Sequence, residues 1–209
     1  MAYIEDGKTN NTRFICSDTK KNVFLIGDSI RLGYCASTRE ALSDMAEVFY
    51  VADNCRNTQY VITNLNSWTN MFSDRTCVDL VQFNCGHWDV AHWRGGKFSL
   101  TSEDEYARNL QIIINMISEL FPRAKIVFAT TTTMNPSGQI GINPRTNGEI
   151  SRYNEIAKAV ASKNNIPIND LFEVTKEWDS SYYKDYCHFT EETNVVLGQA
   201  VATTLKSFL

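Results

Sequence analysis

Val23-Phe24-Leu25-Ile26-Gly27-Asp28-Ser29-Ile30 is the stretch that decides the fold, because an apolar run there meets a Gly-Asp-Ser turn and then a helical pattern. A short apolar run bounded by turn residues is typical of a buried strand. Further runs of this kind follow, and segments with helical periodicity separate them. We predict strands at residues 22–26, 47–51, 78–83, 125–131 and 166–168, and helices at residues 30–44, 58–70, 103–121, 148–164 and 191–208.

Strands that alternate with helices pair in parallel through right-handed crossovers, so that helices cover both faces of the sheet. We therefore expect a three-layer α/β/α fold with a mainly five-stranded parallel sheet. Residues 1–209 are expected to form one domain, with residues 1–21 as an N-terminal extension. In such folds the ligand crevice lies beyond the carboxyl ends of the strands. Ser29 and the loops at residues 84–89, 130–147 and 185–188 should meet at that rim.

The composition and charge of the chain limit which partners and which cellular compartment we expect. A net charge of -4 over 209 residues leaves no basic field for nucleic acid. The polar start of the chain lacks the pattern of a secretory signal, and no apolar run is long enough to span a bilayer. We therefore expect a cytoplasmic protein without a membrane span. Six cysteines occur without CxxC spacing, and in that compartment we expect free thiols.

Three residue types needed for an activated serine nucleophile occur in two motifs. Ser29 stands at a strand-to-helix corner, where its hydroxyl can face the crevice and its amide can stabilise an oxyanion. Asp185 precedes His188 by three positions, which lets the carboxylate orient the imidazole as a general base. The structural alternatives are that Ser29 only caps its helix, and that His188 is a surface residue whose aspartate caps the helix that follows.

The Gly-Asp-Ser turn and the Asp-x-x-His stretch, in that order in an α/β chain, resemble the SGNH hydrolases, also called GDSL-type esterases. The segment Asn84-Cys85-Gly86-His87-Trp88-Asp89 is similar to a further sequence block of that family. The resemblance implies the SGNH-hydrolase fold, which is flavodoxin-like, and no cofactor. It also implies that Ser29 is the nucleophile, His188 the base and Asp185 the group that orients the base.

The oxyanion hole is the part of the pattern from which this chain departs. In the family a glycine amide and an asparagine side chain join the serine amide. Trp88 stands where the asparagine is usual, and Asn84 is the donor that we prefer. No glycine occurs in the loop after the second strand, so we expect the Cys55 amide to donate, since a backbone N–H needs no particular side chain. The alternatives are that Asn84 is a strand-end residue that satisfies loop backbone, and that the loop around Cys55 is an Asn/Asp-rich turn that caps the helix beginning near Thr58.

Other polar groups carry weaker signals. His87, Asp89 and His92 match no standard zinc spacing, so we expect no metal. Arg145 and Trp88 are predicted to contact substrate. The alternatives are that Arg145 forms an ion pair at the surface, as most arginines do, and that Trp88 anchors its loop by packing.

The expected activity is hydrolysis of short acyl esters, above all O-acetyl esters, on a carbohydrate or another polar small molecule. The alternative enzymes are a lysophospholipase or a thioesterase. The alternatives without catalysis are a ligand-binding protein on the same scaffold and a flavodoxin-like nucleotide-binding module. The oligomeric state is left open.

Overall fold

A central parallel sheet organises the computed structural model, which describes residues 3–4, 13–138 and 141–209. The sheet has five strands in the order β4-β3-β5-β6-β7. Their bounds are β3 (Lys21–Ile26), β4 (Ala46–Tyr50), β5 (Leu80–Phe83), β6 (Lys125–Ala129) and β7 (Ile168–Asn169). The register of β3 places Val23 opposite Val48 of β4 and Leu80 of β5. The predicted fold class is therefore confirmed.

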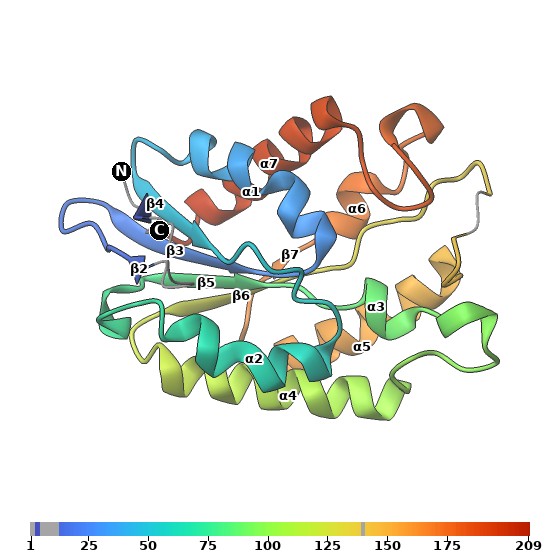
Figure 1. Ribbon diagram of the computed structural model, residues 1–209, viewed down its shortest axis with the longest axis horizontal. Helices are drawn as coiled ribbons and strands as arrows, with labels where there is room; N and C mark the ends of the chain where they lie inside the picture. Colours follow the sequence, from blue (N-terminus) through green and yellow to red (C-terminus); the bar gives the residue numbers. More distant parts are fainter. Residues whose placement is uncertain (1–2, 5–12, 139–140) are drawn as a thin grey trace.

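Helices cover both faces of this sheet, as Figure 1 shows. The helices α1 (Ser29–Ala41) and α7 (Glu191–Lys206) pack together on one face. The helices α2 (Thr58–Thr69), α4 (Glu103–Leu120) and α5 (Asn147–Lys163) cover the other. Short helices α3 (His87–Val90) and α6 (Leu171–Thr175), and the 3-10 turns Arg75–Cys77, Trp93–Gly95 and Ser180–Tyr182, were not predicted.

Alternation of side chains along β3 divides the core into two layers. Phe24 and Ile26 point into the layer beneath α2 and α4, whereas Val23 and Leu25 point into the layer beneath α1 and α7. This is the period of two that places successive strand side chains on opposite faces. All four side chains are fully buried, so β3 is covered on both faces. This explains why its sequence is a continuous apolar run without alternating polar residues.

The predicted N-terminal extension, residues 1–21, lies partly outside the described residues. A two-residue strand β1 (Tyr3–Ile4) pairs antiparallel with β2 (Arg13–Phe14). The Phe14 ring is buried among Phe24, Phe49 and Phe72.

A disulfide joins the segment after β2 to the entrance of β5. Cys16 and Cys77, separated by 61 residues, form this bond with their Cα atoms 6.3 Å apart. The prediction that all cysteines are free thiols is therefore wrong for this pair. The other four, Cys35, Cys55, Cys85 and Cys187, are free and buried.

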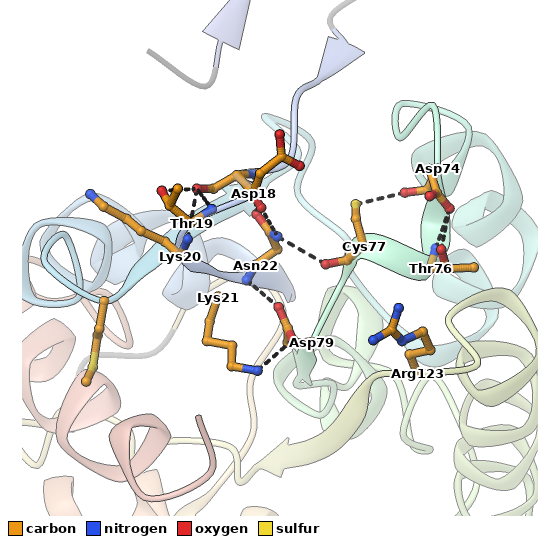
Figure 2. Close-up of a pocket in the computed structure, with 12 residues that line it drawn as sticks. Asp18, Thr19, Lys20, Lys21, Asn22, Asp74, Thr76, Cys77, Asp79 and Arg123 are labelled. Atoms are coloured by element: carbon orange, nitrogen blue, oxygen red, sulfur yellow. Dashed lines mark hydrogen bonds and ion pairs between the residues drawn. The ribbon is translucent and has the colours of Figure 1, made fainter.

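The two ends of the sheet differ in chemistry. At the amino ends of the strands lies a polar hollow of about 530 Å³, shown in Figure 2, where Asp79 accepts hydrogen bonds from the Asn22 amide and the Lys21 ammonium group. At the carboxyl ends β3, β5 and β6 lead directly into the Gly27, Asn84 and Thr130 loops. Across the described ranges, no helix is both long and apolar enough to cross a membrane.

Candidate active site

Ser29 begins α1 directly after the turn that leaves β3. The cap of this helix is Asp28, whose carboxylate accepts a hydrogen bond from the Ile30 amide at 3.0 Å. The alternative in which Ser29 itself caps the helix does not hold, because Asp28 occupies that position. The Ser29 hydroxyl is thus left for another partner.

That partner is His188, which lies 159 residues away in the sequence. The distance between His188 Nε2 and Ser29 Oγ is 2.8 Å. The other ring nitrogen, Nδ1, lies 2.8 Å from Asp185 Oδ2. A proton on Nδ1 satisfies the carboxylate and leaves Nε2 free to accept the serine proton. The structure therefore brings the three predicted side chains into one hydrogen-bonded chain.

The Asp185 carboxylate is held by its own loop. Its Oδ1 accepts hydrogen bonds from the backbone amides of Cys187 at 2.9 Å and His188 at 2.8 Å. Partial burial alone would raise the pKa of Asp185, but these two amides and the His188 ring outweigh burial and lower the pKa below its ordinary value. The cap of α7 is Thr190. Asp185 is therefore an ionised partner of the imidazole and not the cap of that helix.

Asn84 lies against the turn that carries the serine. Its backbone amide continues the sheet by donating to the Ile26 carbonyl at 3.0 Å. Its side-chain Oδ1 is so close to Gly27 that a Cβ built there would stand 1.9 Å from it. Glycine is therefore required at position 27 by close approach and not by backbone conformation. The structure thus places the side chain of Asn84, the predicted oxyanion donor, against Gly27, two residues before Ser29.

Cys55, the other predicted oxyanion donor, needs correction. Its amide donates to the Gly27 carbonyl oxygen at 3.1 Å, so that its N–H is engaged in holding two loops together. The Cys55 side chain is fully buried, and burial raises the pKa of its thiol. In this structure the Cys55 amide is therefore a structural donor.

Arg31 is a buried cation beside the site that was not predicted from the sequence. Its side chain is fully buried, and its guanidinium group donates to the carbonyl oxygens of Val51 at 2.7 Å, Gly27 at 3.0 Å and Asp53 at 2.6 Å. These bonds tie the loop before Ser29 to the loop after β4. A signal was present, since Arg31 falls at helical spacing with the buried Tyr34 and Cys35 on the covered face of α1.

Asp28 is a second buried charge that was missed. Burial raises the pKa of its carboxyl group, against the opposing effects of the Ile30 amide, the Asn84 side chain and the Arg145 and Arg31 guanidinium groups. Its Oδ2 is buried and has no hydrogen-bond partner among the described residues. The turn at Ser29 is thus backed by an electrostatically strained carboxyl group.

Arg145, a predicted substrate contact, lies next to the histidine loop. Its Nε donates to His87 Nδ1 at 3.2 Å, and its Nη2 lies 3.3 Å from the Cys187 sulfur. Burial, and then the charges of Arg145 and His188, hold the pKa of His87 well below its usual range, so this ring is neutral. Burial raises the pKa of Cys187 to about 12. The Cys187 thiol therefore remains protonated and does not form a second nucleophile.

Trp88, the other predicted substrate contact, faces a different hollow. Its ring lies 5.8 Å from that of Trp93, and both line a depression of about 250 Å³ with Arg56 and Tyr60. Trp88 therefore does not take the place of Asn84 beside Gly27.

The cluster of His87, Asp89 and His92 is not assembled around one point. His87 Nε2 bonds to Thr132, Asp89 accepts from Thr58, and His92 bonds to Glu149. In the described part of the chain, the ligand atoms of Asp185, Cys187 and His188 do lie within 4.8 Å of one another, close enough to hold a metal ion. Both nitrogens of His188 are already hydrogen-bonded, however, so this group fits proton transfer better than metal ligation.

This α/β/α fold carries a hydrogen-bonded serine, histidine and aspartate beside the carboxyl ends of its strands. That combination is typical of hydrolases. Residues 25–195 match the model of the GDSL-like Lipase/Acylhydrolase family. The chain belongs to this family and is a carboxylic ester hydrolase. The resemblance to SGNH hydrolases that the motifs indicated is thereby confirmed. No curated protein matches the sequence.

Solved structures share the fold at low sequence identity. One is the acetyl xylan esterase AlAXEase, with a TM-score of 0.69 and 19% identity over 88% of this chain and 99% of that one. Another is Est24, a carbohydrate acetylesterase from Sinorhizobium meliloti, with a TM-score of 0.69 and 15% identity over 91% of this chain and 100% of that one. The M. smegmatis aryl esterase has a TM-score of 0.71 and 17% identity, covering 90% and 100% of the two chains. At these identities the likeness shows the fold alone.

Proposed function

We propose that this protein is a serine esterase in which Ser29 is the nucleophile, His188 the general base and Asp185 the residue that orients the base. The observation that carries this proposal is the continuous hydrogen-bonded chain from Asp185 through His188 to the Ser29 hydroxyl. In the first step His188 Nε2 takes the hydroxyl proton while Ser29 Oγ attacks the acyl carbon. The protonated imidazole then donates to the departing alcohol oxygen. Water, activated by the same imidazole, releases the acid.

The oxyanion of the tetrahedral intermediate is stabilised in this proposal by the Ser29 amide and the Asn84 side chain. The Ser29 amide belongs to the first turn of α1, whose N–H groups favour a developing negative charge. Asn84 lies against Gly27, two residues before the nucleophile. Removing one such donor typically costs about two to three powers of ten in kcat.

The proposed substrate class is a short acyl ester, above all an O-acetyl ester, on a carbohydrate or another polar carrier. Polar groups support it, because Asn135, Thr146 and Asn147 line a cavity of about 550 Å³ beside the histidine loop. Two structural neighbours are described as an acetyl xylan esterase and a carbohydrate acetylesterase. The second candidate is a lipid or thioester hydrolase, favoured by the apolar side chains of Met134, Pro136 and Pro144 in the same cavity.

The test is hydrolysis of p-nitrophenyl acetate, butyrate and octanoate by the wild type and by Ser29→Ala. A matched control is Ser118→Ala, because Ser118 lies on α4 and its hydroxyl bonds only to its own helix at the Ile114 carbonyl. Activity that falls with chain length and disappears only in Ser29→Ala is the expected result. A preference for octanoate would replace acetyl esters by the lipid or thioester candidate. Folded wild type without activity on any of the three esters would favour a ligand-binding protein.

The absence of a nucleic-acid partner and the cellular compartment are separate proposals. The acidic net charge supports the absence of a nucleic-acid partner. A cytoplasmic location is one proposal, whereas the Cys16–Cys77 disulfide is more usual in oxidising compartments. Counting thiols in protein from its native host distinguishes the two, since the disulfide leaves four of the six cysteines free.

A further inference from the structure

The Arg145 guanidinium group is held in place by neutral groups. Its Nε donates to His87 Nδ1, its Nη1 to the Asn143 carbonyl at 3.2 Å, and its Nη2 to the Cys187 sulfur. The guanidinium carbon lies 5.5 Å from the centre of the Tyr186 ring. Each nitrogen therefore makes one contact, and the second N–H of each terminal nitrogen has no acceptor among the described residues.

No carboxylate forms an ion pair with Arg145 in the described part of the chain. Glu149 lines the same cavity, but its carboxylate is paired with His92 Nε2 at 2.7 Å and accepts from Thr146. The charge of Arg145 lowers the pKa of Asp28, but the two side chains form no ion pair. His87 cannot serve as a counterion, because an imidazole ring is either neutral or positively charged. A partly buried guanidinium group with no ionic partner leaves a positive charge and free N–H donors available to a bound anion.

The position of this cation couples it to the proposed nucleophile. Arg145 Nη2 contacts the Cys187 sulfur, which lies 3.7 Å from Nδ1 of His188, and the opposite edge of that ring meets Ser29. Arg145 also lines the cavity of about 550 Å³ beside the histidine loop. The guanidinium group thus borders both this cavity and the loop that carries the proposed base.

We propose that Arg145 binds a carboxylate on the alcohol part of the substrate, so that the preferred substrates are acyl esters of acidic carriers such as O-acetylated uronic acids. The two unused N–H groups, one on each terminal nitrogen, suit the two oxygens of a carboxylate. His87 is a positioning residue in this arrangement. Its Nε2 bonds to Thr132 at 3.0 Å, which leaves Nδ1 as an acceptor that fixes the plane of the guanidinium group. This inference rests on the proposed esterase function.

The experiment compares one sugar ester in two charge states. The substrates are an O-acetylated methyl glucuronoside with a free carboxylate and the same compound with that carboxylate converted to its methyl ester, and release of acetate is measured so that the reacting acetyl group is identical. Steady-state kinetics give kcat/KM for each with wild type, Arg145→Gln, Arg145→Lys and Ser29→Ala. The control is Arg152→Gln, because Arg152 is exposed and pairs with Glu103 on the protein surface.

The wild type should prefer the free carboxylate, and Arg145→Gln should lower that preference by about 10- to 100-fold, as expected for a hydrogen-bonded charge pair. Arg145→Lys should keep part of it, Arg152→Gln should keep all of it, and the preference should shrink as salt is raised. Equal rates on both substrates in the wild type, or an unchanged ratio in Arg145→Gln, overturn the inference. If acetate is still released from the methyl-ester substrate in that case, and this release requires Ser29, the esterase proposal is retained. Release of acetate that survives in Ser29→Ala overturns the esterase proposal itself.

Discussion

Replacing Gly27 by alanine tests the contact that holds Asn84 beside the nucleophile. The new Cβ would stand 1.9 Å from Asn84 Oδ1 and 2.8 Å from Arg31 Cβ. Neither distance is tolerated, so either the Asn84 side chain or the turn must move. Overpacking of this kind costs about 1–3 kcal/mol of folding stability. If Asn84 moves, the reaction also loses an oxyanion donor, and kcat should fall by about two to three powers of ten.

The double variant Gly27→Ala/Asn84→Ala separates these two effects. Removing the Asn84 amide relieves the closest contact, so the double variant should be more stable than the sum of the single changes predicts. Coupling between contacting residues is about 0.5–3 kcal/mol. The activity should not recover, because the donor is absent in both Asn84→Ala and the double variant.

The assays are urea unfolding for stability and p-nitrophenyl acetate hydrolysis for kcat. Gly148→Ala is the matched control, since a Cβ there meets only Thr146 Oγ1 at 3.9 Å and alanine favours a helix over glycine by up to about 1 kcal/mol. Wild-type activity in Gly27→Ala, or strictly additive stabilities, would refute the close approach of Asn84 to the turn.

Three further predictions concern charges and the disulfide. Arg31→Met removes a buried guanidinium group and leaves three carbonyl oxygens without its bonds, so unfolding in urea should show a loss of about 3 kcal/mol or more; a loss below about 1 kcal/mol would contradict this. Burial raises the pKa of Asp89 to about 6, above about 3.9 in an unfolded chain, so the folded state binds more protons between these values. The contribution of Asp89 to the free energy of unfolding is therefore fully present below about pH 4 and is lost as the pH rises through 6. Between pH 4 and pH 7, the free energy of unfolding of Asp89→Asn, measured in urea titrations, should rise by about 3 kcal/mol relative to that of the wild type. An unchanged difference across that range would show that the carboxyl group is not buried. Reduction of the Cys16–Cys77 disulfide, which closes a 61-residue separation, should lower the unfolding free energy by about 4 kcal/mol, whereas the Cys16→Ser/Cys77→Ser variant should no longer respond to reductant.

The layers of this fold were predictable because the relevant signals are local. An apolar run such as Val23 to Ile26 can only be buried, and the capping box between Ser102 and Glu105 marks the start of α4 without reference to the rest of the chain. The rim position of Ser29 and His188 also followed, since parallel strands place their carboxyl ends together. The short helices α3 and α6 were missed because four or five residues carry too little periodicity.

The details of the site depend on contacts between distant segments. The direction of the Cys55 amide is decided by the loop that brings it to the Gly27 carbonyl, and residue type does not reveal this. Likewise, the approach of Cys16 to Cys77 depends on how the segment after β2 packs on the sheet. The contact between Arg145 and His87 joins two loops that are 58 residues apart, and neither loop alone predicts it.

The most direct test of the proposed mechanism is labelling with a serine-directed fluorophosphonate, followed by intact-protein mass spectrometry and peptide mapping. Wild-type protein should gain one adduct, located on Ser29, and Ser29→Ala should gain none. In His188→Gln the labelling rate should fall by about 100-fold or more, because the base that activates the hydroxyl is absent. Folded wild-type protein that takes up no label, or that carries it on another residue, would contradict the assignment of Ser29 as the nucleophile.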